Sequence, residues 1–71
     1  MKLLASFVKE KRKEAKLSQE EFAARAGVAL TVVRKIEQDK GNLNLERVNQ
    51  VLKMFGHELA PAEIKKINPD L

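Results

Sequence analysis

The sequence predicts an all-α fold, a small bundle of four to five helices. Apolar residues recur every three or four positions in several short segments, which is the spacing of one face of an α-helix. These segments begin or end at residues typical of helix ends, such as Ser18 and Gly56. With 71 residues the chain has a thin core, which favours a homodimer. We predict one domain over residues 1–71, with its core in 3–56 and a C-terminal dimerisation segment or tail in 57–71.

The first helix is expected over residues 3–16. Four residues share one of its faces: Leu4, Val8, Arg12 and Ala15. Arg12 is unusual on this inward face, because a buried guanidinium is costly without an anionic partner. Glu37, near the end of a later helix, is the best candidate, so we expect an Arg12–Glu37 ion pair. The alternative is two surface residues that lie close together by chance. Phe7 lies beside the apolar face and is expected to pack on the C-terminal segment.

Residues 18–40 contain two short helical patterns that are joined by a glycine. The first pattern spans residues 19–26 and the second spans residues 30–37. Ser18 is a good N-cap, and Glu21 three residues later completes a capping box. Two helices joined by a tight glycine-containing turn are typical of a helix-turn-helix.

A further helix is expected over residues 45–55, after the N-cap Asn44. Five residues form its apolar stripe: Leu45, Val48, Val51, Leu52 and Phe55. Residues 57–60 precede Pro61 and are expected to be extended, with room for a short dimerisation strand that pairs with a second copy. Pro61 could instead begin one helical turn, and residues 68–71 are expected to fray.

The positive charge is concentrated in the half of the chain that contains the helix-turn-helix. The net charge is +4. Residues 1–40 contain ten Lys and Arg against six Asp and Glu, whereas residues 41–71 contain four of each. This distribution suits a polyanionic partner such as nucleic acid, although a modest positive charge can also serve only to keep a small protein in solution.

The sequence gives little support for a metal-binding or disulfide-bonded protein, a secreted or membrane protein, or an enzyme. There is no cysteine, which excludes disulfides and thiolate metal sites and fits a cytoplasmic location. The apolar opening ends at Lys9, too early for a signal peptide, and no stretch could span a bilayer. The single histidine, His57, has no catalytic neighbours in sequence, and adjacent Glu20 and Glu21 point in different directions on a helix. We therefore expect no enzyme activity, no cofactor and no metal.

The second helix of the helix-turn-helix is expected to contact double-stranded DNA, with its first residues at base edges in the major groove. The predicted base-reading residues are Ala29, Leu30, Thr31, Arg34 and Lys35. Lys35 and Arg34 can donate to guanine, and Thr31 can hydrogen-bond a base or touch a thymine methyl. An exposed Leu30 would suit a thymine methyl, although a surface leucine is also common.

Five other residues are predicted to contact the DNA backbone: Ser18, Gln19, Lys13, Lys40 and Asn42. Ser18 and Gln19 lie at the start of a helix, where backbone N–H groups can hold a phosphate. Capping alone also explains Ser18, and for any single lysine a solvated surface is the simpler explanation.

The run from Leu17 to Gly56 resembles the helix-turn-helix domain of the Cro/cI and Xre-type repressors, and the resemblance extends over residues 4–56. Its motifs are Ser18-Gln19, Phe22-Ala23, Gly27-Val28 and Ile36-Glu37. The resemblance implies a lambda-repressor-like bundle, an ion pair at the positions of Arg12 and Glu37, and a DNA contact at Gln19. It also implies that the five predicted base-reading residues, Ala29, Leu30, Thr31, Arg34 and Lys35, contact bases. The chain departs from the family at Lys11, where leucine is common, and at Leu43, where proline is common.

Within this family, the small size and the ending LNLERVNQVLKMFGHEL resemble HipB-type antitoxins. That resemblance implies a dimer that binds a palindromic operator, represses its own operon and binds a HipA-like toxin kinase. It is also the reason to expect a strand at residues 57–60. One alternative is a stand-alone phage or host repressor. Another, of a different class, is a helical adaptor that binds protein and no DNA.

Overall fold

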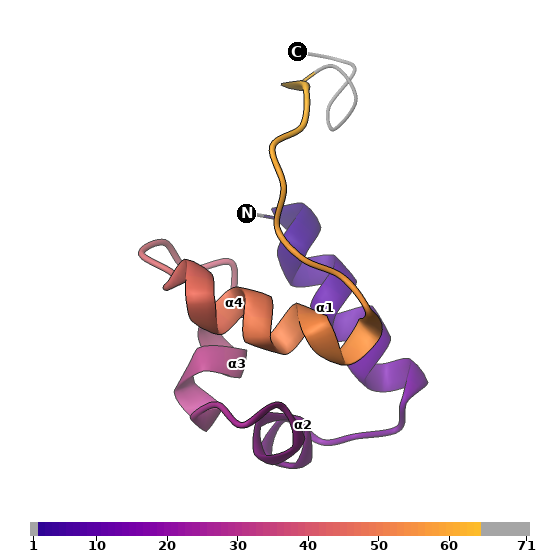
Figure 1. Cartoon of the computed structure of the whole chain (residues 1–71). Coiled ribbons are helices and arrows are strands. Elements are labelled where there is room, and N and C mark those ends of the chain that lie inside the picture. The colour runs from indigo at the N-terminus through magenta and orange to yellow at the C-terminus, as the bar shows by residue number, and fades with distance from the viewer. Residues whose placement is uncertain (1, 65–71) are drawn as a thin grey trace.

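The computed structural model describes residues 2–64, which form a small all-α bundle (Figure 1). Its elements in chain order are α1 (Lys2–Glu14), α2 (Gln19–Ala26), α3 (Leu30–Glu37), α4 (Leu45–Leu52) and the short 3-10 helix η1 (Lys53–Phe55). The described part of the chain contains no β-strand. The predicted all-α class and the predicted bounds of α2 and α3 are therefore confirmed.

The first helix ends two residues earlier than expected. Lys16 adopts a left-handed backbone conformation, with φ of 58°, and this turns the chain out of the helix. The backbone N–H of Leu17 then donates to the carbonyl of Arg12 at 3.2 Å, as in a Schellman motif. Leu17 is buried by this turn, whereas Ala15, which was expected on the inward face, is exposed.

The core lies where the four α-helices meet. Its largest fully buried side chains are Phe22, Ile36, Val8, Val33, Val48 and Val51. Phe22 of α2 stacks on Phe55 of η1, with ring centroids 5.5 Å apart. Helix α3 contacts α1, α2 and α4, so its position is fixed from three sides.

The fourth helix differs from the prediction at both ends. Leu45, which was expected in the apolar stripe, is 64% exposed because it lies in the first turn, before α4 reaches the core at Val48. At the other end, residues 53–55 form η1 rather than a continuation of the α-helix. Gly56, with φ of 70°, ends η1, which agrees with its predicted role as a helix terminator.

The segment after η1 runs extended past α1 without forming a regular element (Figure 1). The ring of His57 lies 4.8 Å from the ring of Phe7, so Phe7 does pack on the C-terminal segment. The backbone N–H of Leu59 donates to Asn49 Oδ1 of α4 at 2.7 Å. Pairing of residues 57–60 with a second copy stays a prediction. The part of the predicted tail beyond residue 64, with the end expected to fray, lies outside the described residues.

Candidate nucleic-acid interface

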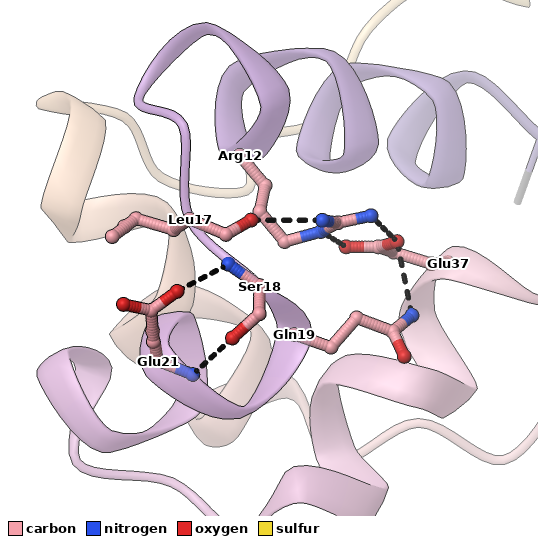
Figure 2. Close-up of polar contacts among 6 residues, drawn as sticks. All are labelled: Arg12, Leu17, Ser18, Gln19, Glu21 and Glu37. Atoms are coloured by element: carbon pink, nitrogen blue, oxygen red, sulfur yellow. Dashed lines mark hydrogen bonds and ion pairs between the residues drawn. The ribbon is translucent and has the colours of Figure 1, made fainter.

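Helix α2 begins with a complete capping box (Figure 2). The hydroxyl of Ser18 accepts a hydrogen bond from the backbone N–H of Glu21 at 3.1 Å. In return, the backbone N–H of Ser18 donates to the carboxylate of Glu21 at 2.9 Å. This second hydrogen bond lowers the pKa of Glu21 below its ordinary value, because it favours the ionised carboxylate. The start of α2 is therefore fixed by residues of its own first turn.

The turn between α2 and α3 is tied to α4 by Gln50. Gly27 ends α2 with φ of 72°, a conformation that favours glycine. The side-chain N–H₂ group of Gln50 donates to the backbone carbonyls of Ala26 and Gly27, both at 3.0 Å. Gln50 lies outside the apolar stripe predicted for its helix, yet it is half-buried against the turn. No local pattern indicates a contact between residues this far apart in the chain.

The expected ion pair between Arg12 and Glu37 is present, and it joins α1 to the end of α3 (Figure 2). Arg12 Nε donates to one carboxylate oxygen at 2.8 Å, and its Nη2 donates to the other at 3.0 Å. The side chain of Glu37 is only 1% exposed and that of Arg12 is 13% exposed. Arg12 Nη1 also donates to the carbonyl of Leu17 at 2.9 Å. The hydrogen bonds to Glu37 raise the pKa of Arg12, because they favour the charged guanidinium.

Gln19 is the third member of this network. Its Nε2 donates to the same Glu37 oxygen that binds Arg12 Nη2, at 3.2 Å. The first residue of α2 and the last residue of α3 are thus linked directly. Figure 2 shows the side chains of Arg12 from α1 and Gln19 from α2 converging on the carboxylate of Glu37 at the end of α3. The family resemblance implied the Arg12–Glu37 ion pair and, separately, a DNA contact at Gln19. It did not imply the hydrogen bond from Gln19 to Glu37.

The predicted base-reading residues lie on α3 and just before it. Thr31, Arg34 and Lys35 are exposed, and their spacing of three and four residues places them on one face of the helix. Ala29 is the exposed N-cap of α3 and makes no side-chain capping hydrogen bond. Leu30 is only half-exposed and packs against the core. The expectation of a fully outward Leu30 is therefore wrong, because the core already explains an apolar residue at this position.

The comparison with known families agrees with this geometry. A family model described as helix-turn-helix matches residues 8–60, which is most of the chain. The chain belongs to the Cro/cI-type helix-turn-helix family. Domains of this kind bind DNA and regulate transcription, so the chain is a DNA-binding transcription regulator. No curated protein and no solved structure shows a significant match to the chain. The finer resemblance to HipB-type antitoxins stays a prediction.

In this helix-turn-helix regulator, the residues predicted to contact the DNA backbone come from α1, the start of α2 and the loop after α3, and they differ in whether they already make contacts within the protein. Lys13, Lys40 and Asn42 are exposed. The hydroxyl of Ser18 already accepts the capping hydrogen bond, so its structural role is explained without DNA. Gln19 is half-buried, with its amide bound to Glu37. The structure thus separates three exposed side chains from two that are already engaged within the protein.

His57, the single histidine of the sequence, lies against residues of its own neighbourhood and of α1. His57 Nδ1 lies 2.6 Å from the carbonyl oxygen of Phe55, and its ring rests on Phe7. Within that range no three His, Cys, Asp or Glu side chains gather in a way that could bind a metal ion. Nor is any helix of the described residues long and apolar enough to cross a membrane.

Proposed function

We propose that this regulator is a homodimeric repressor that binds a palindromic operator through the exposed face of α3. The observation that supports this most directly is the combination of Thr31, Arg34 and Lys35 on one exposed face with Glu37 buried at the end of the same helix. The buried end fixes the helix to the body of the domain, and the exposed face remains available for a partner. A dimer would place two such helices in major grooves about one DNA turn apart, or a small multiple of it.

The side chains on this face suit base edges of different kinds. Lys35 can donate to O6 and N7 of guanine, and Arg34 can do so bidentately or reach a phosphate. Thr31 can hydrogen-bond a base or contact a thymine methyl group. Ala29 and the exposed part of Leu30 offer apolar contact to thymine methyls. Lys13, Lys40 and Asn42, together with Ser18 and Gln19, would hold the phosphates on either side.

We further propose that the repressor is the antitoxin of a toxin–antitoxin pair, which represses its own operon and binds a HipA-like kinase toxin. The support is the resemblance of residues 43–59 to HipB-type antitoxins. A stand-alone phage or host repressor would share the DNA-binding face but would have no kinase partner. Purification of the tagged chain from its native cells, with identification of the proteins that co-elute, separates the two: a kinase-like partner in stoichiometric amount is expected for the antitoxin, and its absence would contradict that role.

The test of DNA binding is a gel shift with the DNA upstream of the chain's own reading frame, beside a scrambled DNA of equal length. Specific binding is expected, with log K falling linearly as log salt rises, because each neutralised phosphate releases counterions. The slope estimates the number of phosphate contacts. No binding to either DNA at low salt would reject the proposed function and leave a protein-binding adaptor. Equal binding to both DNAs would reject sequence specificity.

A further inference from the structure

The amide of Gln19 lies between the buried ion pair and the surface proposed to face DNA. Its Nε2 is 3.2 Å from Glu37 Oε1, and the same oxygen accepts from Arg12 Nη2 at 3.0 Å. The carboxylate is buried and fixed bidentately by Arg12, whereas Gln19 is half-exposed at the first position of α2. A rigid acceptor beneath the surface therefore contacts a side chain that reaches the surface.

The chemistry of the carboxylate decides how this amide is oriented. An ionised carboxylate only accepts hydrogen bonds, so it can bind the N–H₂ side of an amide and not the carbonyl side. One hydrogen of Nε2 is used by Glu37, which leaves the second hydrogen for another acceptor. Figure 2 shows the amide oxygen of Gln19 turned away from the carboxylate. An exposed glutamine would otherwise rotate freely and lose conformational entropy when it bound a partner.

We propose that Glu37 is a positioning residue for DNA binding: it holds the Gln19 amide so that the second Nε2 hydrogen is ready to donate to a phosphate oxygen. This inference rests on the proposed function and deepens it. The ion pair then serves both the fold and the DNA contact, because the carboxylate that fixes α3 to α1 also orients the first residue of α2. A purely structural role for Glu37 predicts no dependence of Gln19 on it.

The test must remove the carboxylate without leaving a buried unpaired charge. The double variant with Arg12→Met and Glu37→Met does this, because apolar residues of similar volume often replace a buried ion pair without loss of stability. Gln19→Met removes the amide and keeps a side chain of similar length. Gln38→Met, at an exposed residue directly after α3, is the matched control for a new surface methionine.

The first measurement is made on the free protein by NMR. In the unmodified chain, the side-chain N–H₂ group of Gln19 should show the heteronuclear NOE of a rigid group, unlike that of Gln38. In the double variant this rigidity should disappear. If Gln19 is as mobile as Gln38 in the unmodified chain, the inference is overturned whatever the DNA measurements give.

The second measurement is affinity for operator DNA and for scrambled DNA. Gln19→Met should weaken binding to both by about tenfold, as expected for a lost hydrogen bond to a charged group, and Gln38→Met should not. In the double variant, adding Gln19→Met should change affinity by about twofold or less. A full loss in that background, or a loss confined to one operator base, overturns the inference. If the unmodified chain binds DNA but Gln19→Met is silent, only this inference fails; if the unmodified chain binds no DNA, the proposed function fails as well.

Discussion

Helices α2 and α3 are both eight residues long, yet they are held in place in different ways. Helix α2 is closed at both ends by its own sequence, with the Ser18–Glu21 capping box at its start and Gly27 in the left-handed conformation at its end. Helix α3 begins at Leu30, and its N-cap residue Ala29 makes no side-chain capping hydrogen bond. It ends before Asp39, a residue that adopts a left-handed φ of 56° without being glycine.

The difference shows which helix depends on the rest of the fold. A helix this short is unstable alone, so α3 without local caps must take its stability from packing. It buries Val33, Ile36 and Glu37 and contacts the other three α-helices. The burial is towards its C-terminal end, and the exposed positions begin at its N-terminus. The end without a side-chain cap is the one whose first residues are proposed to meet base edges of DNA.

The largest effect should come from breaking the buried end of α3. Glu37→Ala leaves the Arg12 guanidinium buried without its anion and should cost about 3–5 kcal/mol of unfolding free energy. Chemical denaturation monitored by circular dichroism measures it. Glu21→Ala, at an exposed carboxylate, is the control and should cost far less. An unchanged unfolding midpoint for Glu37→Ala would mean that the ion pair contributes little to holding α3.

A smaller effect, on binding rather than folding, should follow from changing the exposed face. Lys35→Ala should reduce discrimination between operator variants by about 1–3 kcal/mol if Lys35 contacts a base. The unfolding free energy should stay the same within error, because Lys35 is exposed. Affinities for the operator and for single-base variants measure the discrimination. An equal loss on all sequences would identify Lys35 as a phosphate contact instead.

The sequence predicts the features of α2 and α3 that depend on local residues better than those that depend on packing. Local signals were reliable: Ser18, Glu21 and Gly27 are enough to place both ends of α2. The Arg12–Glu37 pair was predicted from the cost of an unpaired buried charge and from the place of Glu37 near the end of its helix, and the family resemblance also implied it. The bonds from Gln50 to the turn and from Gln19 to Glu37 could not be predicted, because they depend on how whole helices pack. The half-burial of Leu30 is missed for the same reason.

Capping offers a direct way to exchange the properties of the two helices. Ser18→Ala removes the cap of α2 and should cost about 1 kcal/mol, whereas Ala29→Ser offers α3 a cap and should add somewhat less than this. For a domain of this size, about 1 kcal/mol shifts Tm by roughly 4–8 °C. Thermal unfolding of both variants and of their combination measures the exchange. If Ala29→Ser brings no stabilisation, the backbone N–H groups at the start of α3 are already satisfied by their surroundings, and the two helices differ less in their capping.

The smallest effect concerns pH and the cap of α2. The hydrogen bond from the Ser18 backbone lowers the folded-state pKa of Glu21 below its ordinary value of 4.5. The stabilisation is therefore complete above the unfolded-state pKa and is lost as pH falls through the lower folded-state pKa.

Glu21→Gln can still accept the hydrogen bond but does not titrate, since glutamine also completes a capping box. The Tm difference between the unmodified chain and Glu21→Gln should thus be constant from about pH 7 to about pH 5 and should shift in favour of Glu21→Gln in stronger acid. Because Glu21 is exposed to solvent, this change in the Tm difference should be small. Glu20→Gln, which replaces another exposed carboxylate in the same turn, is the control. If the two variants respond alike to acid, the capping box contributes no pH dependence of its own, and the local fixing of α2 depends on the Ser18 hydroxyl alone.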